Sequence, residues 1–237
     1  MLSYDEIKAL PLLDTPVPVR IKFRKVGSLQ YISHLDLQRT FMRCLTRAAI
    51  PVWYTKGFNP HAKLVFSLPL SIGCESECEY VDIKIDRDMP LNDLLDNLRA
   101  EFTDEMKILD VYSPKEKFSE IAYARYKCTI RSDKLTEVSA EAVEEMLTTS
   151  PLNMMKHTKS GEKEIDIVPL IKSVSCKSEN DALILDLVLC AGSEKNLNPE
   201  LPVRAVCERF GLIGDISSYS YRLLRKDVLK EDLTVFC

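Results

Sequence analysis

The sequence predicts an α+β protein made of two tandem ferredoxin-like (β-α-β-β-α-β) halves, each an antiparallel sheet with helices on one face. Two observations lead to this prediction. Short segments that alternate apolar and polar residues are interspersed with segments of helical periodicity, and the pattern restarts after a charged, polar stretch over 113–120. We therefore expect four parts: an N-terminal extension over 1–19, a basic domain over 20–112, a linker over 113–120 and a second domain over 121–237.

In the first half, strand-like and helical patterns follow one another in the order that this fold requires. Helices are expected over 34–49 and 91–102, where apolar residues recur at helical spacing. The segments with strand-like patterns are 20–25, 51–55, 63–71, 79–86 and 107–112.

The second half repeats the plan without repeating the residues. A strand over 124–132 precedes a helix that Ser139 caps, and two or three strands follow within 165–191. A helix within 199–212 that ends at Gly211 and a last strand over 217–229 complete the half.

Composition limits the class of protein. The 237 residues are 46% hydrophobic, no apolar run reaches the roughly 18 residues of a membrane span, and the N-terminus lacks the pattern of a signal peptide. We therefore expect a cytoplasmic protein with no membrane partner. The eight cysteines are dispersed and several lie in apolar segments, so we expect reduced thiols and no disulfide framework.

Positive charge is concentrated near the N-terminus. Residues 20–63 hold nine basic residues and one acid, a net charge of +8, which leaves −12 for the rest of a chain whose total is −4. Such asymmetry is typical of a surface that binds an anionic partner, and nucleic acid is the leading candidate.

Ser33, His34 and Asp36 form the clearest local motif. Ser33 and Asp36 have the spacing of a capping box, so they predict where the helix begins. His34 would be the first helical residue, where the helix dipole favours a neutral imidazole that can contact a phosphate, act as a base or bind a metal. The alternative is a half-buried histidine that bonds a backbone carbonyl.

The same helix carries Arg39, Arg43 and Arg47 at intervals of four residues, so they line one stripe. No acid follows Asp36 until Glu75, whereas solvated helix faces usually mix both signs. We therefore predict nucleic-acid contacts from seven basic residues: Arg24, Lys25, Arg39, Arg43, Arg47, Lys56 and Lys63.

The loop over 57–63 combines turn-forming, aromatic, basic and imidazole groups, which suits binding of single-stranded RNA. Alternatively, the loop is only a turn. We favour core positions for the aromatic residues Trp53 and Phe58 and a functional role for His61 and Lys63, which lie on a polar loop. His34 and His61 are expected to face one cleft with Lys63 and with Ser33, Asp36, Gly57, Phe58 and Asn59.

Cys74 and Cys78 form a C-x-x-x-C pair, but Val81 stands where the cluster motif of radical-SAM enzymes has its third cysteine. We therefore expect no cofactor and no metal bound by this chain itself. The neighbouring acids Glu75, Glu77, Glu79 and Asp82 are expected on the solvated side of a strand. The alternative is that they neutralise the basic surface or bind Mg²⁺.

Several motifs together resemble the bacterial radical-SAM-linked protein family, a domain of unknown function. The matching elements lie within 20–86: Phe23, Lys25 and Gly27; Ser33 to Leu37; Gly57 to His61; and Leu68, Pro69 and Leu70 before Gly73. Thr46 departs from the family's double-arginine ending of this helix. The resemblance implies a radical-SAM protein as partner and an RNA, such as tRNA or rRNA, as substrate.

Three functions remain open at this point. The favoured one is a non-catalytic accessory protein that binds RNA or presents a substrate in a radical-SAM modification or processing system. The second is a metal-independent RNA-processing enzyme that uses His34 and His61 as acid and base. The third is a scaffold whose basic face binds an acidic protein.

Overall fold

The structure is a computed structural model that describes residues 2–135, 138–158, 161–212 and 219–237. It is an α+β protein with antiparallel strand pairing, as the sequence predicts. The chain divides into two compact units, Met1–Phe118 together with Cys237, and Ser119–Phe236. We call them unit 1 and unit 2.

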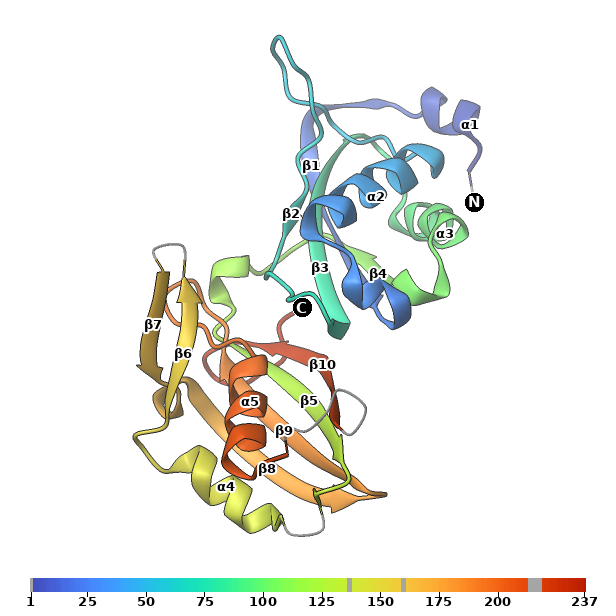
Figure 1. The fold of residues 1–237 in the computed structure, drawn as a ribbon. Coiled ribbons are helices and arrows are strands. Elements are labelled where there is room, and N and C mark those ends of the chain that lie inside the picture. Colours follow the sequence, from blue (N-terminus) through green and yellow to red (C-terminus); the bar gives the residue numbers. More distant parts are fainter. Residues whose placement is uncertain (1, 136–137, 159–160, 213–218) are drawn as a thin grey trace. The chain divides into compact units, whose positions relative to one another are not determined.

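Unit 1 contains three helices and four strands in the part of the chain that the structure describes (Figure 1). In chain order they are α1 (Tyr4–Ala9), β1 (Leu12–Lys25), α2 (His34–Arg47), β2 (Val65–Phe66), β3 (Cys74–Arg87), α3 (Leu91–Glu101) and β4 (Ile108–Tyr112). A short 3-10 helix, Gly27–Tyr31, links β1 to α2.

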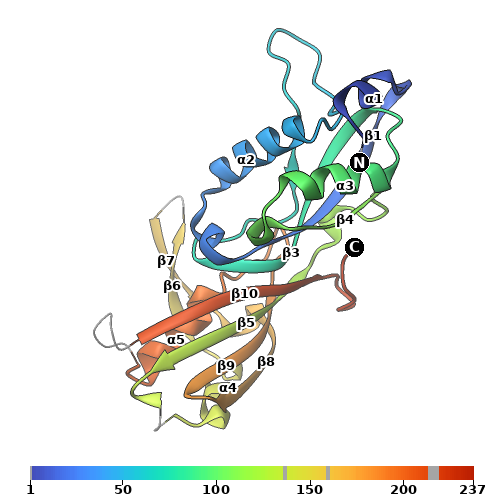
Figure 2. The same cartoon turned by 90° about the vertical axis from the view of Figure 1, so that its right-hand side faces the viewer.

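The sheet of unit 1 has the order β4-β1-β3-β2 and every pairing is antiparallel. Helices α2 and α3 lie on one face of this sheet (Figure 2). The core forms there, because alternate residues of β1 and β3 point toward the helices. Its members include Ile21 and Phe23 from β1, Ile83 from β3, Phe41 from α2 and Leu94 from α3.

The edge beside β3 is formed by two separate segments. Val52 bridges to Ile85, and Val65 in β2 pairs with Asp82. The chain between them leaves the sheet as a loop that a bridge between Tyr54 and Ala62 closes, and Figure 1 shows this loop projecting at the top of the view. The strands expected over 51–55 and 63–71 are therefore isolated bridges and a two-residue strand.

The first 19 residues are part of unit 1 rather than an appendage. Helix α1, which the sequence analysis missed, has a complete capping box between Ser3 and Glu6. Ile7 is buried in the core, and the side chain of Asn97 hydrogen-bonds the backbone of Leu2 through both its oxygen and its nitrogen.

The segment over 113–120 packs against a buried arginine. Arg20 is 1% exposed and donates to both carboxylate oxygens of Asp82, at 2.8 and 3.0 Å. Its guanidinium also donates to the carbonyl of Glu116 and lies 4.2 Å from the ring centroid of Phe118. The expected division into domains over 20–112 and 121–237 with a linker over 113–120 stays a prediction, but Glu116 and Phe118 make specific contacts within unit 1.

Unit 2 contains two helices and six strands among its described residues. They are β5 (Tyr123–Ser132), α4 (Ala140–Thr148), β6 (Asn153–Thr158), β7 (Gly161–Asp166), β8 (Ile171–Glu179), β9 (Ala182–Cys190), α5 (Glu200–Arg209) and β10 (Tyr219–Leu229). Four strands form a sheet in the order β10-β5-β9-β8, while β6 and β7 pair only with each other. Strand β6 is not among the strands expected from the sequence.

Two general features follow from this structure. No helix in the described ranges is long and apolar enough to cross a membrane. All eight cysteines are free thiols, five of them buried.

Candidate nucleic-acid interface

Helix α2 begins where the sequence predicts, because Ser33 caps it. The Ser33 hydroxyl accepts the N–H of Asp36 at 3.1 Å and donates to the Asp36 carboxylate at 2.7 Å. This hydrogen bond and, next, the one from Arg39 lower the pKa of Asp36. The cap fixes the start of the helix and therefore the direction in which its arginines point.

The three arginines of α2 differ in their partners. Arg39 pairs with Asp36 at 3.2 Å, and Arg47 pairs with Glu101 at 2.7 Å, an ion pair that raises the pKa of Arg47. Arg43 is exposed and has no carboxylate partner among the described residues. The same is true of Lys56 and Lys63 on the neighbouring loop. Three exposed cations of this region are thus available to an external anion.

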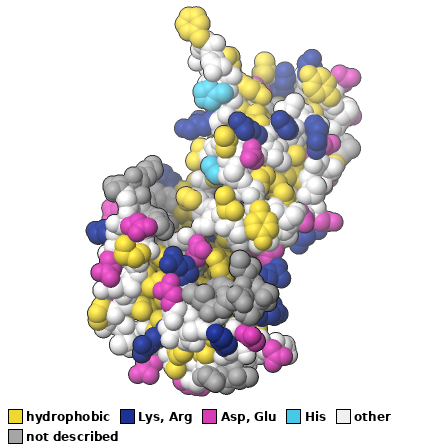
Figure 3. Space-filling model, in the orientation of Figure 1, with side chains coloured by type: hydrophobic (Ala, Val, Ile, Leu, Met, Phe, Trp, Pro, Cys, Tyr) yellow, Lys and Arg dark blue, Asp and Glu magenta, His cyan; other side chains and the backbone are white. Residues whose placement is uncertain are grey.

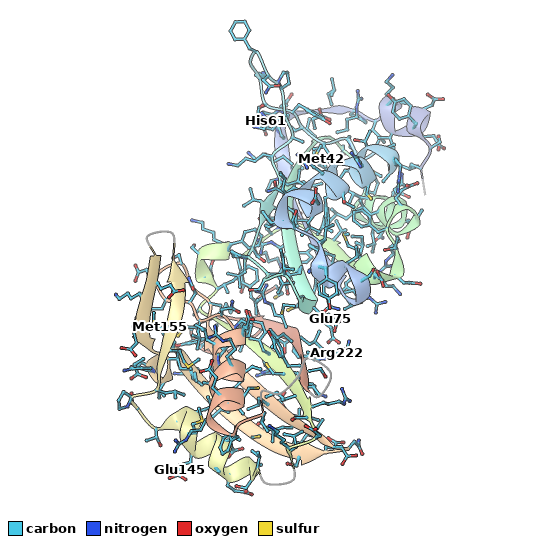
Figure 4. All side chains as sticks on the ribbon, in the orientation of Figure 1. Met42, His61, Glu75, Glu145, Met155 and Arg222 are labelled. Carbon is cyan, nitrogen blue, oxygen red and sulfur yellow. The ribbon has the colours of Figure 1, made fainter. Side chains whose placement is uncertain are left out.

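A groove of about 560 Å³ runs between α2 and the segment that returns from the loop. Helix α2 lines one side and residues 61–64 line the other. The lining residues are Leu35, Gln38, Arg39, Met42, Arg43, His61, Ala62, Lys63 and Leu64. Figure 4 shows the two sides through Met42 on α2 and His61 on the loop.

The groove combines an apolar base with basic edges. Met42, Ala62 and Leu64 are half-buried and pack against the core of unit 1. Arg39, Arg43 and Lys63 are exposed. Figure 3 shows this face with Lys and Arg side chains over α2 beside exposed hydrophobic atoms. Such a surface can bind phosphates at its edges and the flat or apolar part of a ligand at its base.

His61 is held by its own loop. Its Nδ1 lies 3.1 Å from the carbonyl oxygen of Asn59 and 3.2 Å from Oγ1 of Thr55. A carbonyl oxygen only accepts, so Nδ1 carries a proton and Nε2 remains for a ligand.

His34 does not line this groove. Its ring packs edge-to-face against Phe66, with centroids 5.2 Å apart, and its Nε2 is 3.2 Å from the amide nitrogen of Gln38. Ser33, Asp36 and the residues 57–59 are also outside the lining. The structure therefore brings His61 and Lys63 together with Arg39 and Arg43 in this groove. The expected cleft shared by His34 and His61 does not form there, because His34 lies outside the lining.

Two of the predicted nucleic-acid contacts lie elsewhere. Lys25 is 2% exposed, and its ammonium donates to the carbonyls of Leu29, Gln30 and Cys74 at 3.1 to 3.4 Å. The prediction for Lys25 is wrong, since a buried ammonium held by carbonyls does not reach a ligand's phosphate. Arg24 is half-buried, donates to the carbonyl of Asp104, and by the alternation of β1 faces away from α2.

The loop residues also correct two expectations. Phe58 is completely exposed, so its interpretation as a core residue is wrong, whereas Trp53 is half-buried. In the acidic stretch, Glu77 is exposed as expected. Glu75 and Glu79 are 5% and 4% exposed, and Glu75 accepts the N–H of Gly27 at 2.8 Å, so the solvated-strand interpretation is wrong for these two.

Sequence reasoning missed Leu35, Gln38 and Met42 as members of the site. Helical spacing contains the necessary signal, because positions 35, 38 and 42 lie on the same face as Arg39 and Arg43. The described residues include no group of three or more His, Cys, Asp or Glu side chains arranged to hold a metal ion.

The comparison with known proteins identifies the family. No curated protein matches the sequence. Residues 19–199 match a family described as uncharacterized proteins conserved in bacteria (DUF2344), and this range includes α2, the loop and the whole groove. Since the match covers more than half of the chain, the protein belongs to this bacterial family.

Proposed function

We propose that this chain is a non-catalytic, cytoplasmic RNA-binding accessory protein, and that the groove between α2 and residues 61–64 binds the RNA backbone. The observation that carries the proposal is the set of exposed cations, Arg43, Lys56 and Lys63, that lack a carboxylate partner among the described residues. Cations left unpaired next to an apolar groove favour a ligand that presents both phosphates and flat apolar surfaces.

Strand order supports a finer description of the fold. The order β4-β1-β3-β2 in unit 1 and β10-β5-β9-β8 in unit 2 both place the first strand of the unit between the last and the third, if the separate β6–β7 hairpin is set aside. Each unit has a helix after its first strand and another before its last. We therefore propose two tandem ferredoxin-like halves.

The partner is proposed from the sequence resemblance alone. We infer a radical-SAM protein that carries the reaction chemistry, while this chain supplies RNA affinity and no cofactor of its own. Copurification of the tagged protein from its native cell tests this assignment. An iron–sulfur radical-SAM protein should be retained, and its absence from the bound proteins would contradict the partnership.

The enzyme alternative has less support. Acid–base cleavage of RNA needs two proton-transferring groups at one phosphate. His61 lines the groove, but His34 packs on Phe66 outside it. The geometry therefore favours binding over cleavage in this groove.

Salt dependence of RNA binding tests the proposed function directly. Affinity for a labelled single-stranded RNA, measured by fluorescence anisotropy, should fall with salt, with a slope of about 0.7 in log K against log salt for each neutralised phosphate. Replacing Arg43 and Lys63 together by glutamine removes two such contacts. The slope should then decrease by about 1.4.

A matched double variant controls for net charge. Lys163→Gln with Lys177→Gln removes the same charge from exposed positions of unit 2 and should leave the slope unchanged. Salt-independent binding, or an equal effect of both double variants, would show that the groove is not the RNA site.

A further inference from the structure

We propose that Phe58, at the tip of the loop between Tyr54 and Ala62, stacks on an unpaired base of the bound RNA, so that the site selects single-stranded over duplex RNA. This inference rests on the proposed function, because it assumes that RNA is the ligand of the groove. It adds an aromatic contact to the base, beyond the cations that bind the backbone.

The loop has a hydrogen-bonded stem that holds its tip away from the sheet. Tyr54 and Ala62 form a bridge, and the N–H of Thr55 donates to the carbonyl of His61 at 3.0 Å. The N–H of His61 donates in return to the hydroxyl of Thr55 at 3.1 Å. Only the residues between Thr55 and His61 are left to form the tip, and Phe58 is in their middle.

The backbone of the tip requires a glycine. Gly57 has φ +142°, a conformation that other residues rarely adopt, and no atom lies within 4 Å of a Cβ built there. The requirement is therefore conformational rather than steric. Gly57 lets the chain turn just before Phe58, which leaves the ring outside the protein.

The phenyl ring of Phe58 is not packed against the rest of the chain. Its exposed fraction is 112%, the largest among the exposed large hydrophobic residues. Single exposed apolar residues are common and do not by themselves indicate a ligand. The charges around this ring provide the second argument.

The surroundings of the ring are purely basic in sequence. From Leu37 to Cys74 the chain holds five Lys and Arg residues and no Asp or Glu. Lys56 and Lys63 stand on either side of Phe58 in the sequence, and neither has a carboxylate partner among the described residues. An aromatic face between unpaired cations matches the chemistry of a nucleotide, whose base stacks and whose phosphate is negative.

Phe58 is close enough to the groove for one RNA strand to contact both. Phe58 is three residues from His61 at the groove, so an extended chain separates them by at most about 10 Å. A flexible single strand can place a base on the ring while its phosphates follow the cations of the groove. Bases inside a duplex are covered by their neighbours on both faces, so they cannot stack on Phe58.

The test compares ring variants on defined RNA probes. Binding of a short labelled oligouridine to Phe58→Ala should be weaker by about 5- to 150-fold, the loss expected for one base–aromatic stack. Phe58→Trp should bind at least as tightly as the original protein. The salt slope should be the same for all three proteins, because no phosphate contact changes.

Abasic probes identify the contact itself. A single abasic nucleotide moved along the oligomer should weaken binding at one position in the original protein and at none in Phe58→Ala. Tyr4→Ala, which removes another exposed aromatic residue outside the loop, serves as the control and should bind like the original protein.

Each outcome has a defined meaning. Salt-dependent RNA binding that Phe58→Ala leaves unchanged, or equal affinity for the duplex, would overturn this inference and leave the proposed function intact. No RNA binding even at low salt would overturn both. Loss of a copurifying protein in Phe58→Ala, with RNA affinity unchanged, would assign the tip to a protein partner instead.

Discussion

Units 1 and 2 have the same strand order when the β6–β7 hairpin is set aside, but they differ in the charge of the helix that follows their first strand. Helix α2 carries three arginines and one aspartate, whereas α4, which follows the first strand of unit 2, carries three glutamates and no basic residue. Both helices bury an apolar stripe that includes Leu37 and Phe41 in α2 and Val143 and Leu147 in α4. The same packing requirement thus leaves the outer face free to acquire opposite charge.

The two units are also elaborated at the same connection. The chain between α2 and β2 forms the loop with Phe58 at its tip, and the chain between α4 and β8 forms the β6–β7 hairpin. The hairpin mixes charges, with Lys156 and Lys163 beside Glu162 and Glu164. Among the described residues, only unit 1 combines a basic helix with a basic insertion, and the proposal that RNA binds to unit 1 rests on this contrast.

The largest effect is expected from the core beneath the basic helix. Phe41 is fully buried, and its ring contacts Phe23, Phe66 and Phe102 with centroids 4.7 to 5.6 Å apart. Phe41→Ala should lower the free energy of unfolding of unit 1 by about 3–5 kcal/mol. Trp53, the only tryptophan, lies in unit 1, so its emission during urea denaturation reports this transition.

The same experiment examines whether the two units are separate cores. Circular dichroism reports both units, so Phe41→Ala should divide its transition into an early step that coincides with Trp53 emission and a later step. A single transition, shifted to lower urea in both signals, would show that the two units unfold together and would contradict the description of two separate cores.

An intermediate effect is expected from ion pairs of different burial. Arg20→Met in unit 1 leaves Asp82, which is 23% exposed, without the charged hydrogen-bond partner on both its oxygens and should destabilise by about 1.5–3 kcal/mol. Arg125→Met in unit 2 removes a pair whose side chains are 45% and 31% exposed and should change stability by less than about 1 kcal/mol. Equal changes in the urea midpoints of the two variants would contradict the assigned role of burial.

The smallest effect concerns the cap of α2. The pKa of Asp36 is held below its ordinary value of 3.8, first by the Ser33 hydroxyl and then by Arg39. Its contribution to stability is therefore present above pH 3.8 and is lost as the pH falls through the lowered folded value. Asp36→Asn should lower the urea midpoint slightly at pH 7 and have less effect at pH 3, whereas an equal effect at both pH values would exclude a role for the charge.

The helices and the central strands could be predicted because their patterns are periodic and local. Ser33 and Ser139 cap helices as expected, and the apolar positions of 34–49 face the core. The strands expected over 51–55 and 63–71 are longer than the observed bridges and the two-residue strand, because β-like composition does not show where the chain leaves the sheet. Helix α1 is too short for periodicity to indicate it, although Ser3 and Glu6 contain its capping signal.

The candidate site was only partly predictable. The excess of basic residues over 20–63 indicates which part of the chain carries the basic groove. Helical spacing predicts that Arg39 and Arg43 lie on one face of α2, and both line the groove. Burial of Lys25 could not be predicted, since it depends on carbonyls of Leu29, Gln30 and Cys74 that folding brings together. The exposure of Phe58 could not be predicted for a similar reason. It depends on the bridge between Tyr54 and Ala62, which closes the loop and forms only in the folded chain.

The contacts of Arg20 determine where the chain can be cut for work on isolated fragments. A fragment that ends at Tyr112 would lose both the Phe118 ring that covers the guanidinium and the Glu116 carbonyl that accepts from it. The guanidinium, which is almost completely buried, would then be exposed to water on this side. A fragment that ends at Phe118 keeps both groups, so the practical boundary for expressing unit 1 lies after this aromatic residue rather than before the polar segment.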